Sequence, residues 1–104
     1  MKIFNISIII LLISSLNVVA SEISGVPRIT DGDTIKILNK RIRFYGIDTP
    51  EKKQTCINNS KEYSCGEKAT NALKKKIGGK SVTCKVQDKL DRYKRYIGVC
   101  FLED

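Results

Sequence analysis

The feature that most constrains the fold is a set of four cysteines in a chain of 104 residues. Four cysteines allow three different pairings into two disulfides. The chain has no CxxC pair and no histidine, which argues against a zinc site. We expect two disulfides between sequence neighbours, because a small domain lacks core and closing a loop of about 15 residues adds roughly 3 kcal/mol. These pairs are Cys56 with Cys65 and Cys84 with Cys100.

The first 20 residues have the features of a secretory signal peptide. Lys2 precedes a long apolar run, and the small residues Val18 and Ala20 occupy the minus-three and minus-one places of a cleavage site. Polar residues interrupt the run, which argues against a retained membrane anchor. We therefore divide the chain into a signal peptide (1–20) and one small domain (21–104). The mature protein is expected to be exported, either secreted or periplasmic, with no stable insertion into a membrane.

The composition is basic and lacks histidine. Lys and Arg number 19 against 11 Asp and Glu, which gives a formal net charge of +8. This charge attracts polyanions such as nucleic acid, although it also serves to keep an exported protein soluble. Mechanisms that use histidine as a base, nucleophile or metal ligand are excluded. Catalysis must use carboxylates, arginines, lysines, tyrosines or a metal held by oxygen.

The mature sequence predicts a mainly β fold of the α+β type, with five strands. Alternating apolar and β-branched residues predict strands at 21–30, 34–38, 41–47, 80–86 and 96–101. The dipeptides Asp31-Gly32 and Asn39-Lys40 are expected to form the turns between the first three strands. Five strands with one helix after the third predict a small OB-like Greek-key barrel.

One amphipathic helix is predicted from Ser64 to Gly78. Ser64 followed by Glu67 fits a capping box, and apolar residues recur at helical spacing until glycine ends the helix. The preceding residues 52–63 are polar and lack periodicity. They therefore predict an exposed loop that the first disulfide holds in place.

Charged residues surround the hairpin formed by the second and third predicted strands. Asp33 precedes this hairpin and Asp48 follows it, so the two carboxylates are expected to lie close together. A hard cation with oxygen ligands, Ca²⁺ or Mg²⁺, would relieve their repulsion. Arg41 and Arg43 lie on the polar face of the third strand, and arginines presented beside that cation could bind a phosphodiester through two N–H groups. Each motif alone also has a structural explanation as a turn or a solvated hairpin tip.

The spaced combination of these motifs resembles the staphylococcal nuclease (thermonuclease) family. The match extends from about Arg28 to Phe101. The cysteine layout, with QTC before the loop and CGEKA at the start of the helix, is similar to that of secreted bacterial members with four cysteines. The combination is specific although each part is not. Its parts are Asp31-Gly32-Asp33-Thr34, Arg43, Asp48-Thr49-Pro50-Glu51 and Asp91-Arg92-Tyr93-Lys94-Arg95.

The resemblance implies a Ca²⁺ site at the rim of the barrel. Asp33 and Asp48 would supply carboxylate ligands, and Thr49 would add its backbone carbonyl. Asp31 would support these ligands without binding the cation itself. The cation would lower the pKa of a bound water, so that a carboxylate base could act near neutral pH without histidine.

The resemblance also implies the catalytic residues. Glu51 would hold or deprotonate the attacking water, and Arg43 and Arg95 would bind the phosphate and stabilise the five-coordinate transition state. Arginine suits both positions because its charge persists and its planar fork matches two oxygens. Tyr93 and Lys94 are implied as contacts to substrate phosphates.

The sequence departs from the family pattern at two places. Lys94 stands where members usually have glycine, so it would be either a strained residue with positive φ or an additional phosphate contact. The sequence ends at Asp104, directly after the last predicted strand, where the family usually continues with two helices. We therefore expect an OB-like domain without C-terminal helices, stabilised by its two disulfides or only marginally stable.

These features favour a Ca²⁺-dependent endonuclease, a monomer that hydrolyses DNA and RNA with little sequence preference. The resemblance implies that the products carry 3′-phosphate ends. An alternative is a truncated or non-catalytic OB barrel that binds nucleic acid through its basic surface. A third hypothesis, a cationic peptide that acts on membranes, is disfavoured by the ordered β pattern.

Overall fold

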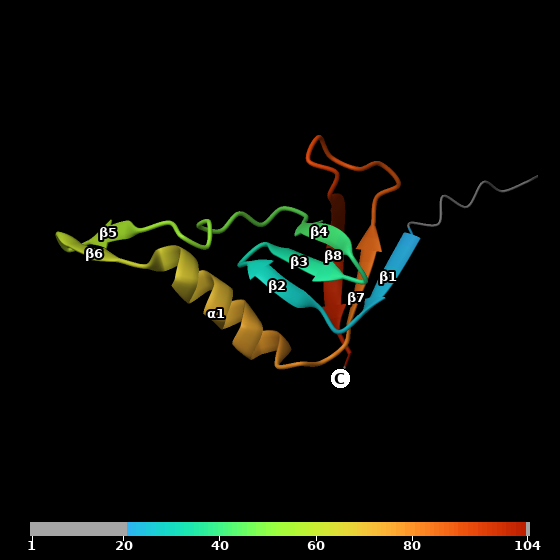
Figure 1. The fold of residues 1–104 in the computed structure, drawn as a ribbon, viewed down its shortest axis with the longest axis horizontal. Helices are drawn as coiled ribbons and strands as arrows, with labels where there is room; N and C mark the ends of the chain where they lie inside the picture. Colours follow the sequence, from blue (N-terminus) through green and yellow to red (C-terminus); the bar gives the residue numbers. More distant parts are fainter. Residues whose placement is uncertain (1–20, 104) are drawn as a thin grey trace, which may run out of the picture.

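The computed structural model describes residues 21–103, so the predicted signal peptide lies outside the described residues. The described chain forms a six-stranded sheet, a separate two-stranded hairpin and one helix (Figure 1). None of the helical structure in this range is long and apolar enough to cross a membrane. The elements are β1 (Ser21–Gly25), β2 (Arg28–Asp31), β3 (Thr34–Ile37), β4 (Lys40–Phe44), β5 (Cys56–Asn58), β6 (Lys61–Tyr63), α1 (Cys65–Ile77), β7 (Val82–Val86) and β8 (Tyr96–Leu102).

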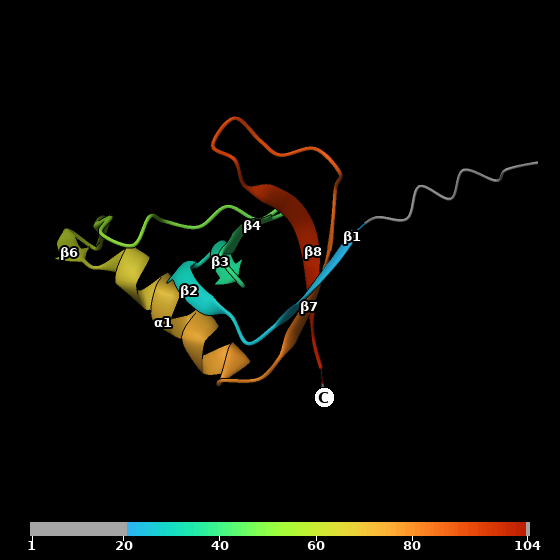
Figure 2. The same cartoon turned by 45° about the vertical axis from the view of Figure 1, so that its right-hand side comes forward.

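The large sheet has the strand order β1-β7-β8-β4-β3-β2 and curls strongly (Figure 2). Its neighbouring strands are antiparallel except for β4 and β8, which run parallel. The helix lies against β2, and the β5–β6 hairpin extends beyond the start of the helix (Figure 1). The predicted mainly β, OB-like fold with a helix between β4 and β7 is confirmed.

The first predicted strand is wrong as a single element, because residues 21–30 form two strands with different partners. β1 pairs with β7, whereas β2 pairs with β3. Pro27 between them has no N–H to donate to a ladder. A side chain at Gly25 would meet Ile37 Cγ2 at 2.9 Å, so glycine allows the chain to pass close to β3 at this point.

Two turns also differ from the prediction. The turn between β3 and β4 uses Leu38 and Asn39, one residue earlier than predicted, with φ of 48° and 64°. Residues 52–63 are not a simple loop, since they contain the β5–β6 hairpin. Its turn residues Asn59 and Ser60 have φ of 51° and 63°. Positive φ at both central residues is typical of a two-residue hairpin turn whose twist matches that of the two flanking strands.

The core consists mainly of β-branched side chains from the large sheet, together with Cys84 and one residue from the helix. Cys84 on β7 lies opposite Cys100 on β8, and the two form a disulfide across the strand pair. The second disulfide joins Cys56 to Cys65, so both predicted pairings are confirmed. The buried core comprises Ile23, Ile35, Ile37, Ile42, Ile77, Val82, Cys84 and Val86.

The helix ends where the sequence predicts but begins differently. Gly78 has φ of 57°, and its N–H donates to Lys74 O over 2.8 Å, which is a left-handed C-terminal cap. The predicted capping box is wrong, because the Ser64 side chain makes no capping hydrogen bond. The free N–H of Gly66 in the first turn instead donates to Gln54 O, in the loop before the hairpin, over 3.1 Å.

Candidate active site

Arg43 lies in β4 between the buried Ile42 and the half-buried Phe44. Ile42 is fully buried in the core, so Arg43 projects from the opposite face. Its Nη2 lies 3.4 Å from Asp33 Oδ2 and 3.4 Å from Asp48 Oδ1. Its Nη1 donates to Phe44 O at 2.9 Å and also to Ile47 O. One guanidinium thus joins the start of β3 to the loop after β4.

Asp33 is the most buried carboxylate of this cluster, at 6% exposure. Its Oδ2 accepts from the Thr49 N–H at 3.1 Å, and its Oδ1 accepts from the Thr34 hydroxyl at 2.9 Å. Burial favours a raised pKa, but the hydrogen bond with Asp31 and these two hydrogen bonds lower it. The nearby Arg43 charge acts in the same direction, so the pKa of Asp33 lies below its ordinary value.

Asp31 behaves in the opposite way. Its Oδ1 accepts from the Asp33 N–H at 3.1 Å. Burial raises the pKa of Asp31, and its side-chain hydrogen bond with Asp33 and the negative charges of Asp33 and Glu51 raise it further. The cluster therefore keeps Asp33 ionised, while Asp31 is the carboxylate that takes up a proton more readily.

Arg95 lies just before β8 and is held by an aspartate four residues earlier. Arg95 Nε donates to Asp91 Oδ2 at 2.9 Å, and its backbone N–H donates to Asp91 Oδ1 at 2.8 Å. Burial acts to raise the pKa of Asp91, but these bonds and the Arg95 charge lower it below its ordinary value. Because Nε is engaged, the two terminal nitrogens of Arg95 are the ones that remain for a ligand.

Three of the predicted residues share one open hollow. Arg43, Asp48 and Arg95 all line a cavity of about 410 Å³ between the end of β4, the loop after it and the start of β8. The parallel pairing of these strands sets Arg43 opposite Ile97, two residues after Arg95. The two arginines are thereby brought together although 51 positions separate them in the sequence.

Tyr93 and Lys94 lie in the turn before β8 and do not line this hollow. The Tyr93 ring has the guanidinium carbons of Arg92 and Arg95 at 4.8 and 5.1 Å from its centroid. The Arg92 side chain also donates to the Tyr93 hydroxyl at 2.7 Å. Lys94 is exposed and has φ of 62°, so the left-handed conformation that favours glycine is present at this position.

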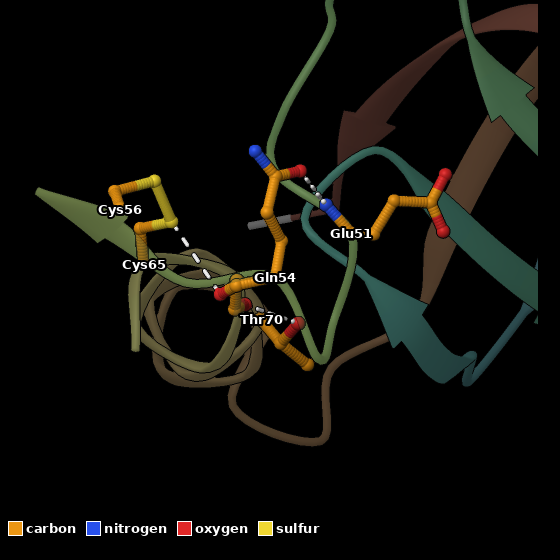
Figure 3. The surroundings of a disulfide bond; sticks show 6 residues. Glu51, Gln54, Cys56, Cys65 and Thr70 are labelled. Carbon is orange, nitrogen blue, oxygen red and sulfur yellow. Dashed lines mark hydrogen bonds between the residues drawn. A yellow bond between two sulfur atoms is a disulfide. The ribbon is translucent and has the colours of Figure 1, made fainter. Parts of the chain in front are cut away.

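Glu51 lies in the loop between β4 and β5, close to the start of the helix. It does not line the hollow of Arg43 and Arg95, and its side chain points away from the helix toward the sheet (Figure 3). Its charge contributes to the raised pKa of Asp31, which places Glu51 on the Asp31 side of the cluster. The Glu51 backbone N–H donates to the Gln54 side chain, and the Glu51 carbonyl accepts from the Gln54 N–H.

The oxygen donors near Asp33 suit a hard cation. Asp33 and Asp48 present carboxylate oxygens to one point, the Arg43 Nη2 atom. Thr49 follows directly, and its hydroxyl is a buried polar atom without a hydrogen-bond partner. Within residues 21–103 no group of three or more His, Cys, Asp or Glu residues converges. Backbone and water oxygens would therefore complete a coordination shell around two carboxylates.

Sequence reasoning assigned no role to three residues that shape this region. Asp91 anchors Arg95, Gln54 closes the loop that holds Glu51, and Arg41 donates from its side chain to Tyr93 O. The spacing of four between Asp91 and Arg95 is a signal that could have found the first contact. The contacts of Gln54 and Arg41 depend on the tertiary fold and leave no such local signal.

The fold is thus a curled OB-like sheet that carries two arginines and two aspartates at its rim. The chain belongs to the staphylococcal nuclease family, because its residues 41–104 match the family described as "Staphylococcal nuclease homologue".

Three proteins illustrate the similarity. The "Succinoglycan biosynthesis protein ExoI" of Rhizobium meliloti (strain 1021) is 34% identical over 87 residues, which cover 82% of this chain and 45% of that protein. An "Uncharacterized endonuclease" of Escherichia coli O157:H7 is 37% identical over 101 residues, 92% of this chain and 60% of that protein. The "Probable staphylococcal-like nuclease CAN3" of Oryza sativa subsp. japonica is 42% identical over 66 residues, 64% of this chain and 15% of that protein. The chain thus spans about half the length of the bacterial relatives.

Proposed function

We propose that this chain is a Ca²⁺-dependent endonuclease that hydrolyses phosphodiester bonds of DNA and RNA with little sequence preference. The observation that carries the proposal is the hollow shared by Arg43, Asp48 and Arg95, with Asp33 bound to the same Arg43 guanidinium. Membership of the nuclease family supports it. We further propose that the protein is exported and acts as a monomer, on the basis of the signal-like first 20 residues and the two disulfides.

Within this proposal the two arginines bind the substrate phosphate. Arg43 and Arg95 would each direct N–H groups at the non-bridging oxygens, and their charge would matter most as negative charge builds up in the transition state. To receive the phosphate, Arg43 exchanges its long contact with Asp48 for the diester. Asp48 is free to move, since its side chain is 93% exposed.

The carboxylates would hold the cation and move the proton. Asp33 and Asp48, with the Thr49 carbonyl, would hold Ca²⁺, which when bound supplies positive charge that screens the diester and favours deprotonation of water. Glu51 would orient the attacking water and accept its proton. Arg95 would stabilise the leaving oxygen, because Asp91 fixes its Nε and leaves its terminal nitrogens for the substrate.

Hydrolysis of single-stranded DNA by the purified, oxidised protein tests the proposal. We expect cleavage with Ca²⁺ and none with a chelator. Arg43→Ala and Glu51→Gln should each lower kcat by about 100-fold or more, as expected when a group that acts in the transition state is lost. Arg28→Ala and Glu62→Gln are the matched controls, because both side chains are exposed and lie outside the site.

Two results would overturn the proposal. Absence of metal-dependent cleavage by the wild-type protein would refute the activity. If Arg43→Ala and Glu51→Gln changed only the affinity for DNA and its salt dependence, the chain would be a nucleic-acid-binding barrel without catalysis.

A further inference from the structure

Gln54 closes the loop that contains Glu51 into a small hydrogen-bonded ring. The Gln54 N–H donates to Glu51 O over 2.8 Å, which forms a tight turn. The Gln54 side chain folds back, and its Oε1 accepts from the Glu51 N–H at 3.1 Å (Figure 3). Both backbone polar groups of Glu51 are thus satisfied by a single residue. Glu51 therefore keeps one backbone orientation as long as Gln54 stays in place.

The same residue is fixed to the helix from its other side. Its backbone carbonyl accepts from the Gly66 N–H at 3.1 Å and lies 3.4 Å from Cys65 Sγ. The disulfide between Cys56 and Cys65 then ties the chain two residues after Gln54 to the first residue of the helix (Figure 3). Gln54 is consequently the point at which the loop, the helix and the disulfide meet.

Gly66 allows the loop to pack directly on the helix. A Cβ at this position would lie 1.6 Å from Glu51 O, which no side chain can accommodate. The Gly66 carbonyl is in turn fixed by the buried Thr70, whose hydroxyl donates to it at 2.8 Å. Glu51 is therefore in contact with the first turn of the helix through its backbone, while its side chain remains free.

This bracing does not bury apolar surface. Residues 51–55 are all exposed and contain neither helix nor strand. An exposed polar segment of this kind is expected to open easily, because it has few packing contacts. The ring of hydrogen bonds, the glycine contact and the disulfide nevertheless all act on this one segment. Order at this place has its clearest use in holding the Glu51 side chain toward the aspartate cluster.

We propose that Gln54 is a positioning residue for Glu51: its amide oxygen holds the Glu51 backbone, and its carbonyl fixes both to the start of the helix. The inference rests on the proposed function, in which Glu51 orients water. It predicts that loss of the amide oxygen misplaces Glu51 without removing any group that touches the substrate.

The test replaces Gln54 and measures both catalysis and local order. Gln54→Met has similar size but no acceptor, and we expect kcat to fall by about 10-fold to 100-fold, in line with small displacements of catalytic groups. KM should change by less than about threefold, because the phosphate contacts of Arg43 and Arg95 remain. Amide hydrogen exchange at Glu51 should become faster. Gln54→Glu keeps a side-chain oxygen acceptor and should restore most of kcat and of the exchange protection.

Gln87→Met is the matched control, since Gln87 is exposed in another loop and far from Glu51 in the sequence. It should leave kcat, KM and exchange at Glu51 unchanged. If Gln54→Met fails to fold, Gln54→Asn takes its place, because its shorter side chain stays polar but places the amide oxygen elsewhere.

The outcomes separate this inference from the proposed function. If the wild-type protein does not cleave DNA with Ca²⁺, the proposed function fails and this inference fails with it. If the wild type cleaves but the folded Gln54 variant keeps the wild-type kcat and the wild-type exchange rate at Glu51, only the role of Gln54 is refuted. A fall in kcat together with faster exchange at Glu51, reversed in Gln54→Glu, supports it.

Discussion

Lys94 adopts a left-handed backbone conformation in the turn that carries Asp91 and Arg95. Its φ is 62°, and its N–H donates to Asp91 O at 2.9 Å. This conformation disfavours a residue with a Cβ, since the Cβ approaches the following carbonyl. Arg95 is still bound to Asp91 by two hydrogen bonds, so the strain at Lys94 does not displace it from that partner.

Lys94→Gly should therefore stabilise the fold. We expect the free energy of unfolding to rise by about 1 kcal/mol, because glycine removes the strain at positive φ. Urea denaturation of the oxidised protein measures this change. Lys89→Gly in the same loop is the control, because Lys89 does not have positive φ, and it should leave stability unchanged or lower it. Equal stability of wild type and Lys94→Gly would show that the lysine side chain offsets the strain.

Asp91 makes the stability of this turn depend on pH. Its pKa is lowered in the folded state by its bonds to Arg95, so its charged form favours folding. This contribution is complete above the unfolded pKa of about 3.9 and is lost as the pH falls through the lower folded pKa. Wild type should exceed Asp91→Asn in stability by a constant amount above about pH 5, and the difference should shrink below about pH 4.

Unfolding by urea between neutral and acidic pH measures that difference. Asp88→Asn is the control, since Asp88 is exposed in the same loop, and its effect should be small throughout. A difference between wild type and Asp91→Asn that grows as the pH falls would have the wrong sign and would contradict the role of the ionised carboxylate.

Among single residues, the sequence predicted best those whose roles follow from local pattern. The alternation around Ile42 placed Arg43 outside the core, and both disulfide pairings followed from proximity in the sequence. The brace at Gln54 was not predictable in this way. It depends on a contact between a loop and the start of the helix. It also requires glycine at position 66, because Glu51 O lies where a Cβ would be, and only the folded structure shows this contact.

At the scale of elements, the two disulfides act on different parts of the molecule. Cys84 is fully buried in the core and joins the centres of β7 and β8. The Cys56–Cys65 bridge connects the β5–β6 hairpin to the helix and lies outside the main core cluster. The Cys84–Cys100 bridge is therefore part of the global fold, whereas the Cys56–Cys65 bridge orders a local segment.

Removal of each bridge should show this difference. The double variant Cys84→Ala/Cys100→Ala should lose about 3 kcal/mol of unfolding free energy, both from chain entropy and from the core position. Cys56→Ala/Cys65→Ala should lose less, while amide exchange in residues 51–63 becomes faster. Urea denaturation and hydrogen exchange on both variants measure these effects. Equal losses of global stability would show that the hairpin belongs to the same cooperative unit as the sheet.

The elements themselves were predictable where hydrophobic periodicity is regular. β3, β4, β7, β8 and α1 lie close to their predicted ranges. The division of residues 21–30 into β1 and β2 was missed, because one run of β-forming residues serves two different partners. The β5–β6 hairpin was missed because its sequence is polar and therefore lacks a hydrophobic pattern. A disulfide near its ends, and not burial in the core, holds it in place.

At the scale of the whole molecule, the site depends on a pairing that no local pattern reports. β4 and β8 are parallel neighbours although the hairpin, the helix and β7 lie between them in the chain. This crossover brings Arg95 to the hollow that Arg43 and Asp48 already line. The pattern of strands and helix predicted an OB-like barrel with Asp33 and Asp48 close together, whereas the convergence of Arg95 with Arg43 was predicted only by the resemblance to a nuclease family.

The basic charge of the molecule should govern its affinity for nucleic acid. Lys and Arg exceed Asp and Glu by 8 in the full chain, and two arginines line the proposed phosphate site. Binding of a single strand should release counterions, so the logarithm of the association constant should fall linearly with the logarithm of the salt concentration. The slope should be about −0.7 for each phosphate neutralised.

Fluorescence anisotropy of a labelled single-stranded oligonucleotide measures this slope, with Glu51→Gln as the background because that variant should bind but cleave much more slowly. Contact with three to five phosphates predicts a slope of about −2 to −3.5. Adding Arg43→Ala should make the slope shallower by about 0.7, since one phosphate contact is lost, whereas adding Arg28→Ala should change it less. An unchanged slope in the Arg43 variant would place the bound phosphates elsewhere on the basic surface. The hollow between β4 and β8 would then not be the substrate site, whatever activity the protein shows.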